Sequence, residues 1–254
     1  MTELTGAMTL ERAHVEGLEL VRVHTKRFVA VVNDLDAQQL AAPAPSSSWT
    51  VGEVVAHVQS VFLRYTVDRQ RAATPAEVAT SNARDIETLG VDAPAAVVSI
   101  EEQLAFLDTV VALIEPTQEF PFHAGQPITM AGGWGNLLGE LLAHGDDIAR
   151  AVGTTFTIPS ADLEIMWRFA SPVLRGWVRS PQQPPDSWVL HFPFGAIQFV
   201  FDADGLTVSP GDSGGHGHHI AVADAAELAL AFPYRRRAIT DPVLAALADR
   251  FVSL

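Results

Sequence analysis

One short stretch, Glu140-Leu-Leu-Ala-His144-Gly-Asp-Asp147, is rich in side chains that can bind metal ions or transfer protons. Glu140 and His144 are four residues apart, so in a helix their side chains lie one turn apart on one face, and Asp147 continues that face. Flanking leucines predict that this face points inward. A buried carboxylate beside an imidazole needs a compensating partner, because burying an unpaired charge is costly, and a divalent metal ion is a common one.

A third candidate ligand, His57, lies in a separate predicted helix. Thr50 and Glu53 form the pattern of a capping box, which predicts that this helix begins at about residue 50. A lone histidine on an apolar helix face is more often a core residue than a ligand. Placed opposite Glu140 and His144, however, His57 completes a set of two imidazoles and one carboxylate, which is typical of an open zinc site or a similar divalent site. Asp147 would then orient one imidazole without binding the ion itself.

The elements that must position these residues can be read from hydrophobic periodicity. Before residue 155 it predicts four helices, at about 9–40, 50–72, 97–114 and 129–153. Residues 75–94 are polar, and we expect them to be irregular with at most a short helix. His123, in a predicted loop, could overhang a site at the start of the last helix. Four such helices with short loops indicate a four-helix bundle.

After residue 155 the pattern changes to short alternating runs. Ser160 is expected to begin a helix that ends near residue 178. Four strands are predicted, at 187–192, 196–201, 206–209 and 219–223. A helix at 224–232 and a final helix from Thr240 follow. The predicted fold class is therefore α+β, with an N-terminal four-helix bundle at 1–156 and a small α/β domain with an antiparallel sheet at 157–254.

The composition excludes several classes of function. Asp and Glu outnumber Lys and Arg 30 to 16, for a net charge of −14, which argues against nucleic-acid binding and against docking on an anionic membrane. The chain has no cysteine, so it can form neither a disulfide nor a thiolate zinc site. Without a recognisable signal peptide or an apolar run of about 18 residues, we expect a cytoplasmic protein, either a monomer or a homodimer.

Two stretches resemble motifs of the mycothiol-dependent maleylpyruvate isomerase family. Residues 48–58, SWTVGEVVAHV, are similar to its W-T-V-x-D-V-V-x-H-L stretch, and residues 140–153, ELLAHGDDIARAVG, to its E-x-x-x-H-G-x-D-x-A-R-A-x-G helix. Their order and separation also match. The resemblance covers about residues 9–155 and implies a DinB-like metal-binding bundle. It carries the metal ligands over to His57, Glu140 and His144.

The C-terminal part resembles, less specifically, the small sterol-carrier-like domain of the same family. There an Asp-Ala-Ala-x-Leu helix precedes an arginine; here Asp224 begins the matching helix, and Arg235, Arg236 or Arg237 would occupy the place of that arginine. Such an arginine could pair with a substrate carboxylate; a solvated basic turn is the alternative. One departure is Asp146, where the family motif commonly has tryptophan. It changes the polarity near the metal if its side chain faces the site.

The resemblance implies an enzyme that needs a divalent metal, with zinc expected, and mycothiol as cosubstrate. The metal would turn the thiol into a thiolate for addition, cis–trans isomerisation or S-transfer on a small electrophilic substrate. Two alternatives remain open, a metal-dependent hydrolase on the same three residues and a non-catalytic small-molecule binding protein. His216, His218 and His219, in a glycine-rich stretch, could bind metal adventitiously or belong to a flexible loop.

Overall fold

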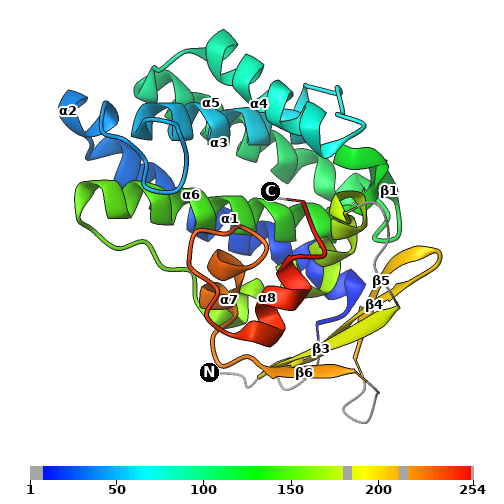
Figure 1. Ribbon diagram of the computed structural model, residues 1–254. Helices are drawn as coiled ribbons and strands as arrows, with labels where there is room; N and C mark the ends of the chain where they lie inside the picture. The colour runs from blue at the N-terminus through cyan, green and yellow to red at the C-terminus, as the bar shows by residue number, and fades with distance from the viewer. Residues whose placement is uncertain (1–7, 180–184, 212–216, 253–254) are drawn as a thin grey trace.

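The computed structural model describes residues 8–179, 185–211 and 217–252. Four long helices form the predicted bundle: α1 (Leu10–Asn33), α3 (Val51–Thr66), α5 (Ala93–Val110) and α6 (Met130–Val152). Helix α6 packs against α1 and α3, and α5 packs against the same two helices from the other side. The α+β class and the order of bundle and sheet are confirmed (Figure 1). None of the helices in the described part of the chain has the length and apolar character needed to cross a bilayer.

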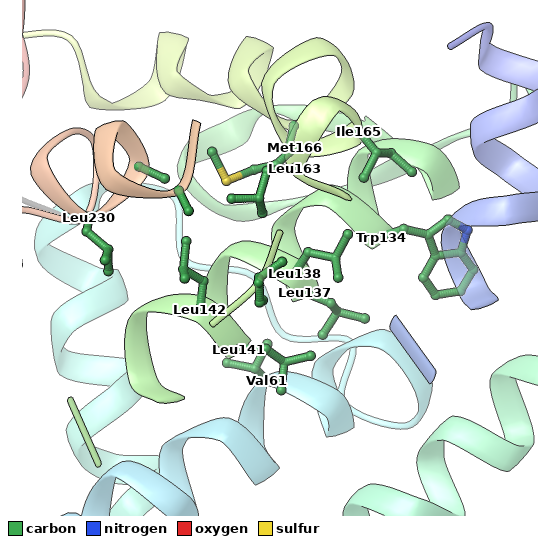
Figure 2. Close-up of a cluster of buried hydrophobic side chains, with 14 of the residues drawn as sticks. Val61, Trp134, Leu137, Leu138, Leu141, Leu142, Leu163, Ile165, Met166 and Leu230 are labelled. Atoms are coloured by element: carbon green, nitrogen blue, oxygen red, sulfur yellow. The ribbon is translucent and has the colours of Figure 1, made fainter. Parts of the chain in front are cut away.

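Helix α6 is the centre of the molecule. Of its 23 residues, 18 are buried, because the bundle covers one side of it and the C-terminal part covers the other (Figure 1). Figure 2 shows leucines of α6 among Leu163, Ile165 and Met166, which come from the segment after the bundle. Gly135 allows this approach, since a Cβ atom there would lie 2.7 Å from the Cα atom of Met166. The candidate ligands on α6 are therefore held in a helix with little freedom to move.

Two expectations for the N-terminal part were wrong. The helix predicted at 9–40 ends at Asn33, because Asp36 caps a separate short helix, α2 (Ala37–Leu40). The stretch at 75–94 that we expected to be irregular contains a full helix, α4 (Pro75–Leu89). Thr74 caps its first turn, Pro75 fits the first helical position and Gly90 ends it at φ +69°. The periodicity missed α4 because Ile86 is its only buried residue among those described.

The C-terminal sheet contains four strands in the order β5-β4-β3-β6. They are β3 (Asp186–Phe192), β4 (Gly195–Asp202), β5 (Gly205–Pro210) and β6 (His218–Ala221). Strands β3, β4 and β5 are antiparallel, as predicted. Strand β6 departs from the expectation, because it lies on the opposite edge from β5 and pairs with β3 in parallel.

The remaining helices differ from the prediction in length and type. The helix expected from Ser160 consists of 3₁₀ and π turns, η3 (Ser160–Leu163), η4 (Met166–Ala170) and η5 (Ser171–Trp177). Pro172 in η5 has no amide hydrogen, so α-helical hydrogen bonding does not continue through it. Helix α7 (Ala225–Ala231) matches its prediction, and α8 (Pro242–Ala248) ends before the C-terminus.

Candidate metal centre and its cavity

The predicted capping box fixes the helix that carries His57. The Thr50 side chain accepts a hydrogen bond from the backbone N–H of Glu53, and the Glu53 carboxylate accepts one from the N–H of Thr50 at 2.7 Å. These reciprocal bonds satisfy the free N–H groups of the first turn and set where α3 begins. His57 therefore lies about two turns into the helix, where α3 packs on α6.

The structure brings the three predicted ligands together. Glu140 Oε2 lies 3.2 Å from His144 Nε2 and 3.6 Å from His57 Nε2. One possible ligand atom from each residue lies within 4.8 Å of the other two. Within the described ranges, no other group of three or more His, Asp or Glu side chains is gathered in this way. Both histidines are buried.

Burial and neighbouring charges set the protonation states of this cluster. Burial lowers the pKa of His57 to about 4, so its ring is neutral near pH 7. Burial alone would raise the pKa of Glu140, but the adjacent imidazoles of His144 and His57 outweigh it and hold the pKa well below its usual range. For His144, burial lowers the pKa, yet the carboxylates of Asp147 and Glu140 raise it overall. Two imidazoles thus surround an ionised carboxylate.

These residues fit a divalent metal ion. Two buried imidazole nitrogens face the same carboxylate oxygen, and His57 Nδ1 and His144 Nδ1 have no hydrogen-bond partner among the described residues. Behind His144, Asp147 Oδ2 lies 3.6 Å from Nδ1. Two nitrogens and one oxygen with a carboxylate behind one imidazole make the donor set of an open zinc site.

Trp49 is a residue of this site that the sequence reasoning missed. Its ring centroid lies 4.9 Å from that of His57 and 6.3 Å from that of His144. It also lines the cavity beside the cluster. The available signal was its place one residue before the cap of the helix that carries His57, where a large apolar side chain folds back over the first turns.

The structure separates the three candidate arginines. Arg236 lines the cavity, and its Nε lies 3.1 Å from Oδ2 of Asp147, which is fully buried. Arg235 instead donates a hydrogen bond to the carbonyl of Ala248. Arg237 does not line the cavity. The sequence could not distinguish these neighbours, because all three stand in one turn.

Asp146, which departs from the family motif, faces away from the cavity. Its two carboxylate oxygens accept hydrogen bonds from both terminal nitrogens of Arg237, each at 2.7 Å. Asp146 is not among the described residues that line the cavity. This departure therefore adds no charge to the cavity lining, and the ion pair between Asp146 and Arg237 instead joins α6 to the segment after α7.

A cavity of about 660 Å³ adjoins the cluster. Its wall includes His57, Glu140 and His144 at one place and Arg64 and Arg71 at another. The predicted overhanging histidine, His123, lines the same cavity from η2 (His123–Gly125), between the short strands β1 (Glu119–Pro121) and β2 (Pro127–Thr129). The sequence reasoning did not identify Arg64 or Arg71.

The histidine-rich stretch is only partly described. His216 lies outside the described residues. His218 and His219 belong to β6 and not to a flexible loop. His219 Nδ1 is 2.8 Å from Nε2 of His191 on β3, and His218 Nε2 is 3.3 Å from Oδ2 of Asp186. They do not form a group of three metal-binding side chains with other described residues.

Comparisons with known proteins bear on the family and on the fold of the chain. The family model described as the mycothiol maleylpyruvate isomerase N-terminal domain matches residues 21–149, just over half of the chain. A crystal structure of the mycothiol-dependent maleylpyruvate isomerase aligns with a TM-score of 0.51 and 16% identity, over 89% of this chain and 90% of that chain. A histidine-to-alanine mutant of that isomerase aligns over the same shares with 16% identity and a TM-score of 0.48. No curated protein matches the chain. At this identity, the structural likeness establishes the fold.

Proposed function

The chain belongs to the mycothiol maleylpyruvate isomerase family, and from this premise we propose a metal-dependent enzyme that uses mycothiol as cosubstrate on a small electrophilic substrate. His57, Glu140 and His144 would hold the ion, for which zinc is the best candidate. The observation that carries the proposal is the convergence of two buried imidazoles and one half-buried carboxylate, with ligand atoms within 4.8 Å of one another, in the wall of a 660 Å³ cavity. We place the enzyme in the cytoplasm, where low-molecular-weight thiols are kept reduced.

A divalent ion held by His57, Glu140 and His144 would lower the pKa of a coordinating thiol, so that a thiolate would be available near neutral pH. The chain's own residues prepare the site for this chemistry. Burial keeps His57 neutral, which leaves a nitrogen lone pair available. Asp147 behind His144 favours a proton on Nδ1, which would leave Nε2, on the side of Glu140, as the nitrogen that binds the ion.

The nucleophile would arrive with the cosubstrate, because the chain contains no cysteine. The cavity lies within the range of about 300–1,000 Å³ that is usual for small-molecule sites. In an isomerisation, the thiolate sulfur adds to one carbon of a double bond, the resulting single bond rotates, and loss of the same sulfur restores the double bond. The thiol is regenerated and the substrate keeps all its atoms. In an S-transfer the sulfur stays on the substrate, and another substituent leaves in its place.

Among the three arginines, we assign Arg236 to the site as a positioning residue. It lines the cavity and balances the charge of Asp147, which in turn lies beside His144. Because Arg236 belongs to the segment after α7, the C-terminal part would complete the site that α3 and α6 begin.

The first experiment measures the metal content of tag-free protein by plasma mass spectrometry. We expect about one divalent ion per chain, lost in His57→Ala and in Glu140→Ala. A double variant, His191→Ala with His219→Ala, controls for metal on the sheet surface and should keep the ion. A wild type without bound metal would contradict the ligand assignment. Variants His57→Ala and Glu140→Ala that keep their metal would contradict it as well.

The second experiment titrates mycothiol into the metal-loaded protein, with glutathione and bacillithiol for comparison. Mycothiol should bind to the wild type and not to Glu140→Ala. If none of the three thiols binds, the thiol-dependent proposal is wrong. Turnover of ester or amide substrates without any thiol would identify a hydrolase instead.

A further inference from the structure

The charge that lines the cavity is opposite in sign to the charge of the whole chain. The chain has a net charge of −14. Among the described residues that line the cavity, however, Glu140 is the only acid, whereas Arg64, Arg71 and Arg236 are all cationic. An acidic protein that surrounds a cavity with arginines favours an anionic ligand there over a neutral or cationic one.

Two of these arginines stand apart from the ligand cluster. Arg64 follows His57 by seven residues on α3, which corresponds to two turns and about 10 Å along the helix axis. Helix α6 runs antiparallel to α3: His57 meets Glu140, whereas Tyr65 lies against Gly133, where a Cβ atom would be 2.8 Å from the Tyr65 ring. The cavity thus has a ligand-cluster region and a separate region, the arginine end, formed by Arg64 and Arg71.

The positive charge at the arginine end is only partly neutralised. Arg64 is buried and pairs with Asp85, the Nη2–Oδ2 distance being 2.6 Å, but its Nε has no hydrogen-bond partner among the described residues. Arg71 donates its hydrogen bonds to backbone carbonyl oxygens. In the described part of the chain, no carboxylate lies within ion-pair distance of Arg71. Arg71 therefore has no carboxylate in direct ion-pair contact, and the charge of Asp68 acts on it only from a greater distance.

His123 adds a neutral donor to the arginine end. Its Nδ1 accepts a hydrogen bond from the backbone N–H of Ala72 at 3.2 Å, so the neutral ring carries its proton on Nε2, on the other side of the ring. Much of the remaining lining is apolar and comes from α5 and its neighbours and from the η4–η5 segment. It includes Leu107, Val110, Ile114, Met166, Val173 and Leu174.

We propose that the cavity accepts an electrophile with an apolar body and a terminal carboxylate, and that Arg64 and Arg71 bind this carboxylate. A guanidinium and a carboxylate form short, charge-assisted hydrogen bonds, and the apolar lining covers the body of the ligand. The separation of about 10 Å between Arg64 and His57 along α3 sets the length that such a substrate would span. The inference rests on the proposed function in treating the ligand as the electrophile, whereas carboxylate binding itself requires no thiol.

The test compares two probes of equal length, octanoate and octanamide. Binding is measured by calorimetry on the protein as purified and again after treatment with a chelator, so that a contact between the carboxylate and the ion is recognised. Trp49, Trp167 and Trp177 line the cavity and provide a fluorescence signal as a second readout. We expect Arg64→Met to weaken octanoate binding at least about tenfold and to leave octanamide within about twofold, in both preparations.

Arg84→Met is the matched control. Arg84 is exposed, pairs with the same Asp85 at 3.0 Å, and does not line the cavity, so this variant should bind octanoate as the wild type does. If Arg64→Met does not fold because Asp85 loses its buried partner, the double variant Arg64→Met with Asp85→Asn gives the same comparison.

If Arg64→Met weakens the binding of octanoate and octanamide equally, or weakens the binding of neither, the assignment of Arg64 to a carboxylate is wrong. The assignment is also wrong if Arg84→Met loses as much octanoate binding as Arg64→Met does. The general electrostatic field of the protein, and not a contact with Arg64, would then account for the binding. The proposed function fails separately, through absent metal or absent thiol binding. If the protein prefers octanoate to octanamide but binds no thiol, the carboxylate assignment at the arginine end stands and the proposal of a thiol-dependent enzyme is wrong.

Discussion

Arg236 Nε lies 3.1 Å from Asp147 Oδ2, and this ion pair connects the C-terminal part of the chain to the central helix that carries Glu140 and His144. Asp147 is fully buried and also stands 3.6 Å from His144 Nδ1. A single carboxylate therefore contacts a candidate metal ligand on one side and a cation from another part of the fold on the other. Changes on either side of Asp147 should affect both stability and metal binding.

Asp147→Asn should weaken metal binding about 10- to 100-fold, because the amide does not hold His144 as the carboxylate does. The affinity is measured by competition with a chromophoric chelator. Asp146→Asn is the control: Asp146 pairs with Arg237 and does not line the cavity, so its variant should bind metal within about twofold of the wild type. Equal losses in the two variants would contradict the role of Asp147.

Arg236→Met should lower the free energy of unfolding of the metal-free protein by about 3–5 kcal/mol, because the fully buried Asp147 loses its guanidinium partner. The measurement is urea unfolding in the presence of a chelator. Adding Asp147→Asn to the same chain should restore most of the lost stability. A cost below about 1 kcal/mol for the single change would show that the pair stabilises the fold no more than an exposed ion pair does.

Gly139→Ala should destabilise the protein by about 1–3 kcal/mol, since the new Cβ atom would lie 2.0 Å from the hydroxyl oxygen of Tyr234. Thermal unfolding measures the effect. Combining the change with Tyr234→Phe removes the nearest clashing atom and should recover part of the loss. The next atom of that ring would still be 2.8 Å away, so a full recovery would contradict the packing described for this contact.

His123 should make the protein less stable in mild acid. Burial, followed by the charges of Arg64 and Arg71, lowers the pKa of His123 from 6.5 to about 4. Between these two pH values the unfolded chain binds a proton that the folded protein excludes, so stability is lost as the pH falls through this window. Each unit of pKa difference corresponds to about 1.4 kcal/mol, so the interval from 6.5 to about 4 gives roughly 3–4 kcal/mol in total.

The variant His123→Gln tests this pH dependence. Urea unfolding at pH 7 and at pH 4.5 should show a smaller loss of stability for the variant than for the wild type, by about 2 kcal/mol. Other carboxylates and histidines titrate equally in both proteins, so the difference isolates His123. Identical losses in the two proteins would show that the ring is protonated in the fold as readily as in the unfolded chain.

Local sequence was sufficient for the elements that carry the candidate ligands. The i, i+4 spacing of Glu140 and His144 determines their common face in any helix, and Thr50 with Glu53 determines where the helix of His57 begins. Helix α4 was missed because the same periodicity vanishes when an element buries almost nothing. Its caps, Thr74 and Gly90, were visible in the sequence and carried the information that the apolar pattern did not.

Which distant segments of the chain pack together could not be predicted from the sequence. The parallel placement of β6 beside β3 depends on which sheet edge the chain reaches, and strand patterns are the same for either edge. The arginine end of the cavity has the same origin. Arg64 looks like the polar side of a helix in the sequence, and only the packing of α4 and the loop before it encloses it.

The sequence by itself determined the residue types of the candidate site and the helices on which they stand, because helical spacing is a local property of the chain. Only the tertiary structure decided which of Arg235, Arg236 and Arg237 approaches that site. Arg235 adopts a left-handed backbone conformation with φ +53°, and the three successive side chains leave this turn toward three different partners. Their directions are set by the packing of the turn against α6, which no local pattern encodes.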